Sequence, residues 1–197
     1  LGALAKGDPG YEILLIDQHN FHLFTPLLYQ VATGLVGPDH TVYPVRSIAR
    51  QHGFAFRESV VQSIDPERKE VLTDDGPIPY DYLIIALGSV TNYFGTPGAE
   101  EHALTLKTLR DGIALRNRFN DCFERAEEAR TKEERCRYLN FVIVGGGATG
   151  VELATSLINL IDIVLIKDYP SIQRDEVRVV LVEARDKILP SIDPELA

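Results

Sequence analysis

The stretch Phe141–Leu153, FVIVGGGATGVEL, constrains the fold of this chain more than any other part of the sequence. Residues 141–144 are apolar and predict a buried strand, and apolar residues recur at helical intervals from Val151 to Leu157. Between the two lie three glycines with the spacing G-x-G-x-x-G: Gly145, Gly147 and Gly150. Strand, glycine turn and helix in this order predict a dinucleotide-binding loop, and the alternative is a glycine turn in some other α/β domain.

Each glycine of this loop has its own physical reason. Gly145 allows a tight turn, Gly147 lets a pyrophosphate approach the backbone, and Gly150 lets the helix pack closely on the strand. The N-terminus of the following helix carries unpaired N–H groups and the positive end of a dipole, which suits phosphate.

Composition limits the class of protein. The chain has 197 residues, enough for one domain or two small ones, with 45% hydrophobic and 25% charged residues, as in an ordinary globular protein. Its formal charge of −9 argues against nucleic-acid binding, because a phosphate backbone attracts a basic surface.

Cysteine and histidine content predicts no metal site and no disulfide scaffold. Cys122 and Cys136 form no C-x-x-C pair, and His19 and His22 have no carboxylate or thiol at ligand spacing. Two reduced cysteines are typical of a cytosolic protein. The longest apolar candidate, Leu153–Ile166, is too short for a membrane span and carries a charge, and no signal peptide is recognisable.

Two predicted strands end on an acidic residue. The first runs from Tyr11 to Asp17, and the second from Arg178 to Glu183. A carboxylate at this point accepts hydrogen bonds from a ribose, although a solvated strand-end acid is the alternative for Asp17. Glu183 lies 38 residues after Gly145, farther than usual, which a long helix and an extended connection explain. The glycine loop expected before the first strand is missing, and the sequence stops before the remaining strands of the second unit.

The rest of the chain predicts an α/β fold in two parts. Residues 1–10 fit the end of a helix, and a helix is expected at Pro26–Ala32 with Gly34 as its stop. Further strands are expected at Phe54–Ile64, Glu70–Thr73 and Tyr82–Leu87, the last one buried; turns are expected at 65–68 and 74–77. A helix should follow from a capping-box-like start at Thr108–Asp111 to about Ala129, then a solvated link at Lys132–Arg137 and, later, an exposed connection at Lys167–Arg174.

Taken together, these segments resemble the two-dinucleotide flavoproteins, and within them the type II NADH:quinone oxidoreductases (alternative NADH dehydrogenases). The resemblance covers essentially the whole chain, and four segments carry it: Ile16–Gly34, Tyr80–Gly95, Phe141–Ala154 and Lys167–Ala197. It implies two Rossmann-like domains, both incomplete: an FAD-binding domain at 1–107 without its N-terminal glycine loop, and an NADH-binding domain at 108–197 without its C-terminal strands.

The resemblance also implies site residues. On the FAD side, Asp17 and Gln18 would contact the adenosine, and the backbone of Val61 would meet the adenine. Ala86 and Gly88 would form a turn near the flavin, where Leu87 replaces the threonine of the wider superfamily. Thr33 and Gly34 would lie by the isoalloxazine ring.

On the NADH side, the resemblance implies that the glycine loop lines the pyrophosphate through Gly145, Gly147, Ala148, Thr149 and Gly150. Glu183 would bind the adenosine ribose and favour NADH over NADPH, a preference that Arg185 could weaken. Glu152, expected in the first turn of the glycine helix, would lie beside the nicotinamide and flavin N5 as the catalytic carboxylate. Its alternative is an ordinary helix-start acid in water.

The implied reaction is hydride transfer from NADH to FAD and then electron transfer to a membrane quinone, without proton pumping. Such an enzyme would sit on the cytoplasmic face of the cell membrane as a peripheral protein, through parts not in this sequence, and could form a homodimer. A protein made of these 197 residues alone is not expected to bind FAD tightly or to turn over.

Three alternatives stay open at the level of sequence. A disulfide reductase of the same fold needs a redox-active cysteine pair near the flavin, and residues 17–34 contain no cysteine. A ferredoxin or rubredoxin reductase or an NADH oxidase would differ in electron acceptor. A nucleotide-binding fragment without catalysis is the third.

Overall fold

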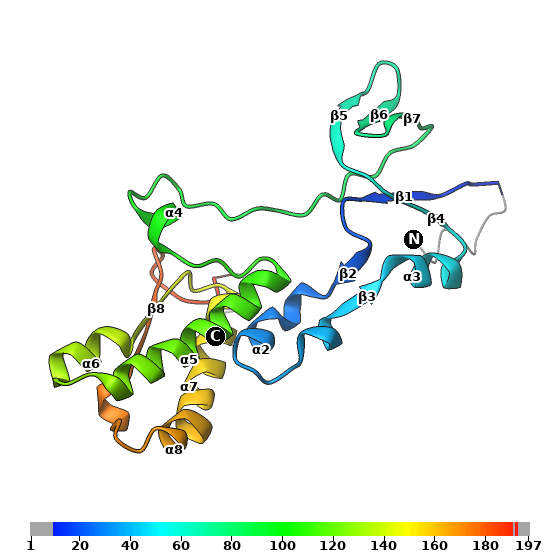
Figure 1. Ribbon diagram of the computed structural model, residues 1–197. Helices are drawn as coiled ribbons and strands as arrows, with labels where there is room; N and C mark the ends of the chain where they lie inside the picture. The colour runs from blue at the N-terminus through cyan, green and yellow to red at the C-terminus, as the bar shows by residue number, and fades with distance from the viewer. Residues whose placement is uncertain (1–9, 191, 193–197) are drawn as a thin grey trace. The chain divides into compact units, whose positions relative to one another are not determined.

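The computed structural model of the protein describes residues 10–190 and residue 192 (Figure 1). The helix end expected within residues 1–10 lies almost wholly outside the described residues. Contacts divide the chain into two compact units, which are treated separately below. Unit 1 holds residues 10–23 and Val42–Val90, and unit 2 holds Phe24–Thr41 and the chain from Thr91 onward.

Unit 1 is built on two strands that run parallel. β1 (Leu14–Asp17) pairs with β4 (Ala55–Glu58) in a register that sets Asp17 opposite Glu58. The chain between them forms the other elements of this region, which are β2 (Phe21–Leu23), its antiparallel partner β3 (Val42–Pro44), and α3 (Val45–His52). The predicted strand before Asp17 is therefore confirmed, in a shorter form.

A three-stranded antiparallel meander completes unit 1. Its strands are β5 (Val61–Asp65), β6 (Glu70–Thr73) and β7 (Gly76–Pro79), in the order β5-β6-β7. The predicted strand at 54–64 is interrupted at residues 59 and 60, so that it forms β4 and β5. Asp65 Oδ1 accepts the N–H groups of Glu67 and Arg68, both at 3.0 Å, which confirms the predicted turn.

The prediction of a buried strand at Tyr82–Leu87 is wrong. Residues 83–90 have no regular secondary structure, and Tyr82 and Leu87 are 83% and 73% exposed. An apolar run forms a buried strand only where neighbouring strands accept its backbone groups and side chains. No described strand pairs with this run, and it therefore stays extended and exposed.

Unit 2 contains the glycine stretch and the larger core. Its main elements are η1 (Thr25–Leu27), α2 (Leu28–Ala32), η2 (Pro38–Thr41), α4 (Ala99–His102), α5 (Leu109–Glu128), α6 (Lys132–Tyr138), β8 (Asn140–Val144), α7 (Ala148–Leu160), the π-helical turn η3 (Ile161–Leu165), α8 (Ile166–Asp168), η4 (Arg174–Glu176) and β9 (Arg178–Val182). The helix predicted at 26–32 is confirmed, with a 3₁₀ first turn and Gly34 at φ 73° after its end.

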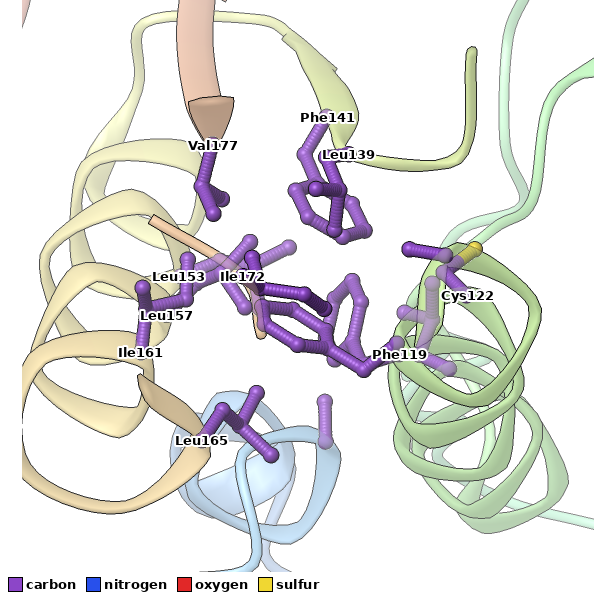
Figure 2. Close-up of a cluster of buried hydrophobic side chains, with 14 residues drawn as sticks. Phe119, Cys122, Leu139, Phe141, Leu153, Leu157, Ile161, Leu165, Ile172 and Val177 are labelled. Atoms are coloured by element: carbon purple, nitrogen blue, oxygen red, sulfur yellow. The ribbon is translucent and has the colours of Figure 1, made fainter. Parts of the chain in front are cut away.

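Aromatic and aliphatic side chains of α5, α7, β8 and the chain before β9 form the core of unit 2 (Figure 2). Phe141 on β8 lies edge-on to Phe119, with ring centroids 5.5 Å apart, and stacks on Phe123 at 6.2 Å. Leu157 on α7 is fully buried beside them. Strand and helix on either side of the glycine loop are thus fixed by a common core.

The predicted capping box at the start of α5 is confirmed. Thr108 Oγ1 accepts the N–H of Asp111 at 3.2 Å, while Asp111 Oδ2 accepts the N–H groups of Thr108 and Lys107, each at 2.8 Å. Partial burial alone would raise the pKa of Asp111, but the hydrogen bonds from the Thr108 and Lys107 backbone outweigh it and the pKa is lowered.

Two expected loops turned out to be structured. The link at Lys132–Arg137 forms helix α6, capped by Thr131, whose side chain accepts the N–H of Glu134. The connection at Lys167–Arg174 is anchored, since Ile172 is 1% exposed and the carbonyl of Ser171 accepts from Arg135 Nη1 at 2.9 Å. Both elements lack a long apolar pattern, so that capping and tertiary packing, which sequence periodicity does not report, decide their structure.

A buried ion pair supports the same connection. Arg135 Nη1 lies 3.3 Å from Glu176 Oε2, and the Glu176 side chain is only 6% exposed. The N–H of Gln173 and the Arg135 guanidinium lower the pKa of Glu176 despite its burial. This pair joins α6 to the chain that leads into β9.

The helix through α7, η3 and α8 is long and apolar. Over Ala148–Asp168 it is long and apolar enough to cross a membrane by length and composition only, with a mean hydropathy of 1.7 and 33% of that window buried. One such helix is weak support for a span, because core helices of soluble proteins meet the same criterion. The expectation that the chain has no spanning segment stays a prediction.

Candidate dinucleotide site

The carboxyl ends of β8 and β9 and the N-terminus of α7 meet at the glycine loop. β8 and β9 are parallel, and their register sets Val144 opposite Val182. The N–H of Gly145 donates to the Val182 carbonyl at 2.8 Å, so that the loop leaves the sheet directly beside β9. In open α/β sheets, ligands bind at this edge.

Gly145 and Gly150 are required by the backbone geometry of the loop. Gly145 has φ 109°, which residues with a side chain rarely adopt. A Cβ at Gly150 would lie 1.9 Å from the Gly145 carbonyl oxygen, closer than any real contact. The first turn of α7 therefore packs directly on the turn that follows β8, as predicted from the spacing.

Gly147 differs from both. It has an ordinary extended backbone, φ −74° and ψ −178°, and no heavy atom of the described residues lies within 4 Å of a Cβ built there. It precedes the first residue of α7, and the next two residues, Ala148 and Thr149, are exposed. The space beside Gly147 is thus open at a helix N-terminus, which is where a pyrophosphate would fit.

Glu183 is bound to the glycine loop itself. Its Oε2 accepts the N–H of Gly146 at 2.6 Å, and its Oε1 accepts the N–H of Arg185 at 2.9 Å. These bonds, that from Arg185 first and that from Gly146 second, lower the pKa of Glu183, and the carboxylate is ionised at neutral pH. The long separation in sequence does not prevent the strand-end acid from reaching the loop.

Gly146 is the residue that sequence analysis missed. It is the x of G-x-G, yet a Cβ there would lie 3.0 Å from Glu183 Cβ and 3.0 Å from Ile188 Cγ2. The signal was the run of three consecutive glycines, which the spacing rule does not interpret.

The expected position of Glu152 needs a correction. α7 begins at Ala148, so Glu152 is its fifth residue and lies beyond the first turn, where the effect of the helix dipole on a carboxylate has weakened. The helix starts earlier than the sequence suggested, because Gly147 is the capping residue and Ala148 is already helical. The side chain of Glu152 is exposed.

Three of the residues expected on the FAD side lie near one another in unit 1. The backbone carbonyl of Asp17 accepts the N–H of Ser59 at 3.0 Å, which brings the chain before Val61 beside the end of β1. Asp17 Oδ1 accepts the N–H of His19 at 2.8 Å across its own turn, and Gln18 is exposed within that turn.

Asp74 fixes the chain between β4 and β5. Its Oδ1 accepts the Ser59 hydroxyl at 2.5 Å and the Val60 N–H at 2.8 Å, and these two bonds lower the pKa of Asp74. The approach to Val61 is therefore held by side chain as well as backbone.

The other expected FAD residues are more dispersed. Thr33 is buried, and its hydroxyl donates to the Tyr29 carbonyl at 2.9 Å, so its polar group is already used within α2. Gly34 is exposed at φ 73°. Ala86 and Gly88 belong to the extended exposed run of unit 1, in which Gly88 has φ 74°.

Neither cysteine is placed for redox chemistry, and the described residues contain no cluster of side chains that could hold a metal ion. Cys122 and Cys136 are both free; Cys122 is buried in the core of unit 2, and burial raises the pKa of its thiol.

The strand, the glycine loop and the open helix N-terminus define an α/β dinucleotide-binding protein. The chain belongs to the pyridine nucleotide-disulphide oxidoreductase family, whose sequence pattern it matches over residues 2–197. The fold class predicted from the sequence is confirmed by this match.

Proteins of similar sequence indicate which members of this family the chain resembles. The chain is 38% identical over 201 residues to the external alternative NAD(P)H-ubiquinone oxidoreductase B4, mitochondrial, of Arabidopsis thaliana, covering 96% of this chain and 34% of that protein. It is 38% identical over 199 residues to a type II NADH:quinone oxidoreductase of Mycobacterium tuberculosis, covering 98% of this chain and 42% of that protein. The resemblance inferred from the sequence is confirmed.

Solved structures agree with the fold. NDH2 of Plasmodium falciparum in complex with NADH matches 95% of this chain and 40% of its own, with a TM-score of 0.85 and 26% identity. A sulfide:quinone oxidoreductase of Aquifex aeolicus matches with a TM-score of 0.70 at 22% identity, which concerns the fold alone. The chain spans between a third and somewhat over two fifths of the length of these proteins.

Proposed function

We propose that this chain is part of a flavoprotein that oxidises NADH and passes the electrons to a quinone. The observation that carries the proposal is the contrast between Gly150, where a side chain has no room, and Gly147, where the loop is open. This contrast is what a pyrophosphate-binding loop requires. The relatives, two of which are named as NAD(P)H or NADH:quinone oxidoreductases, support the same reaction.

In this proposal, residues 108–197 bind NADH. The pyrophosphate lies against Gly145, Gly147 and the N-terminal N–H groups of Ala148, Thr149 and Gly150, and Glu183 accepts from the adenosine ribose. An ionised carboxylate repels a 2′-phosphate, so NADH is the preferred donor, and the neighbouring cation of Arg185 reduces that preference.

Residues 1–107 contribute to FAD binding. Asp17 and Gln18 contact the adenosine and the backbone of Val61 meets the adenine. Ala86, Gly88, Thr33 and Gly34 would help to hold the flavin ring. Thr33 would do so through its backbone or methyl group, because its hydroxyl donates to the Tyr29 carbonyl. FAD, when bound, supplies the hydride acceptor and the route for electrons to the quinone.

Glu152 is proposed to orient the nicotinamide and assist proton movement. Its carboxylate is exposed one turn beyond the open end of α7, on the same helix whose N-terminus faces the phosphates. Glu152→Gln keeps the shape and removes the charge, and we expect kcat to fall about tenfold to a hundredfold with little change in KM for NADH. An unchanged kcat would remove Glu152 from the reaction.

The names of the relatives support a quinone as the electron acceptor. We propose a quinone in the membrane, a peripheral enzyme on the cytoplasmic face without proton pumping, and no nucleic-acid partner; a homodimer is one arrangement to test. The mitochondrial names of several relatives offer the mitochondrion as the alternative location. A ferredoxin or rubredoxin reductase and an NADH oxidase are the alternatives for the acceptor.

The experiment is an absorption spectrum of the full-length protein. We expect bound flavin, bleached by NADH under anaerobic conditions and restored by a soluble quinone. A folded full-length protein without flavin would overturn the proposal. Bleaching by NADH with no reoxidation by quinone would mean that the electron acceptor is not a quinone.

A further inference from the structure

The chain that follows β9 returns to the glycine loop. We call residues 184–190 the loop strap. The N–H of Leu189 donates to the Gly146 carbonyl at 2.7 Å, and Ile188 Cγ2 would lie 3.0 Å from a Cβ at Gly146. On the other side of the same residue, the Glu183 carboxylate accepts the Gly146 N–H at 2.6 Å. Gly146 is thus held through both its N–H and its carbonyl group.

Leu189 adopts a backbone conformation that leucine rarely occupies. Its φ is 49°, in the left-handed region, where a side chain meets the neighbouring carbonyl. Such a conformation persists where surrounding contacts determine it, and strained residues of this kind cluster at ligand-binding segments. In this conformation the N–H of Leu189 donates to the glycine loop, and its carbonyl accepts the N–H of Ile192 at 2.9 Å.

We propose that the loop strap is a positioning element for the dinucleotide, with Leu189 as its positioning residue. The inference rests on the proposed function, since it concerns the same NADH site. Leu189 does not touch the dinucleotide; it acts through Gly146, the residue immediately before the open Gly147.

The physical reason is the freedom of glycine. Three successive glycines at 145–147 can adopt many backbone conformations, and a loop that must be ordered on binding weakens affinity by the entropy lost. The bonds from Leu189 and Glu183 fix the Gly146 peptide before the ligand arrives. The N–H groups beyond it are then already directed toward the open space, and binding loses less entropy.

A pair of substitutions at one position tests this element. Leu189→Gly keeps the N–H donor and tolerates positive φ, whereas Leu189→Pro removes the donor and cannot adopt that φ. In the full-length flavoprotein, we expect Leu189→Pro to raise the Kd and KM for NADH about fivefold or more, the worth of about one hydrogen bond. Flavin content and kcat at saturating NADH should stay near the wild-type values, while the melting temperature of Leu189→Pro should fall because proline cannot adopt the φ of Leu189. Leu189→Gly should bind NADH within about twofold of wild type.

A second pair keeps the test decisive if Leu189→Pro fails to fold. Gly146→Ala places a methyl group 3.0 Å from both Ile188 Cγ2 and Glu183 Cβ and should weaken NADH binding. Ile188→Ala in the same chain removes the first of these contacts and should restore part of the affinity. No rescue in the double variant would overturn the proposal.

The outcomes separate the two proposals. If wild-type protein binds no NADH, the proposed function fails. If wild type binds NADH and Leu189→Pro binds it equally well, or if Leu189→Gly weakens binding as much as Leu189→Pro, the loop strap fails and the NADH site stands. A change in kcat without a change in KM would also contradict a positioning role in binding.

Discussion

Each of the two parallel strand pairs in this molecule has an acidic residue at the end of a strand, and only one pair leads into a recognisable loop motif. β1 and β4 end at Asp17 and Glu58, and β8 and β9 lead into Gly145 and Glu183. Asp17 accepts an N–H from its own turn, while Glu183 accepts one from the glycine loop. The partner of an acid at the end of a strand is therefore decided by the loop beside it, not by its position on the strand.

The two regions also differ in their cores. All fourteen residues of the buried hydrophobic cluster belong to unit 2. In unit 1, the buried hydrophobic residues among those described are Val45, Ala49 and Val71. The glycine loop is thus mounted on a packed scaffold, while β1 and β4 depend on backbone pairing and a few side chains.

The largest expected effect comes from a substitution in the core of unit 2. Leu157→Ala removes a fully buried side chain of unit 2 and should cost about 2–5 kcal/mol of unfolding free energy. Val71→Ala, a smaller truncation at a buried aliphatic position of unit 1, should cost less, about 1–2 kcal/mol. Chemical denaturation of both variants measures the difference, and an equal or reversed ranking would contradict the contrast between the cores.

The next effect concerns the closed side of the glycine loop. Gly150→Ala forces a Cβ against the Gly145 carbonyl, and we expect a loss of about 1–3 kcal/mol or more together with loss of NADH binding. Hydrogen exchange should show loosened protection in α7 and β8. Wild-type stability in this variant would mean that the helix does not pack on the turn as described.

The capping box at the start of α5 tests how much this helix contributes to the stability of unit 2. Thr108→Ala removes the hydroxyl of the capping box and should cost about 1 kcal/mol, whereas Thr108→Ser keeps the hydroxyl and should cost little. Thermal melts of the two variants measure this. Equal melting temperatures for Thr108→Ala and wild type would show that the cap adds nothing to the core that α5 supplies.

The smallest effect concerns the pH dependence of the stability that Glu183 contributes. The folded pKa of Glu183 lies below its ordinary value of 4.5, so its ionised form stabilises the folded protein above that pH, and this contribution is lost as pH falls through the folded pKa. The stability difference between wild type and Glu183→Gln should therefore be largest at neutral pH and shrink below about pH 4.5. Asp17→Asn serves as the matched control, because the Asp17 carboxylate accepts the N–H of His19 within its own turn. A difference that does not change with pH would contradict the bond to Gly146.

Sequence alone predicted the parts whose pattern is local. The glycine spacing and the Thr108–Asp111 box each contain their own physical cause, and each was confirmed. The strand before the glycines was confirmed as a strand but not as a buried one, since Val142 and Val144 are 60% and 80% exposed. The strand at 82–87 was predicted wrongly because a strand needs partners that periodicity does not report. The helix at 132–138 was missed for the converse reason, since its cap and its ion pair lie outside any apolar pattern.

The site was predictable to the same extent. The spacing named Gly145, Gly147 and Gly150, and the strand-end rule named Glu183. Gly146 and Leu189 could not be found this way, because their role depends on a contact across some forty residues of sequence. The position of Glu152 was off by part of a turn, since only the structure identifies Gly147 as the cap of α7.

The most direct test of the central claim is NADH binding to the full-length protein with Gly147→Ala. The substitution meets no described atom within 4 Å and fits the backbone, so the stability should fall by only about 0.5–1 kcal/mol, the cost of alanine in place of glycine at a helix N-cap. The new methyl group would occupy the space for the pyrophosphate, and the affinity for NADH should fall at least about tenfold. A stable Gly147→Ala protein that binds NADH as tightly as wild type would contradict the claim that this loop holds the dinucleotide.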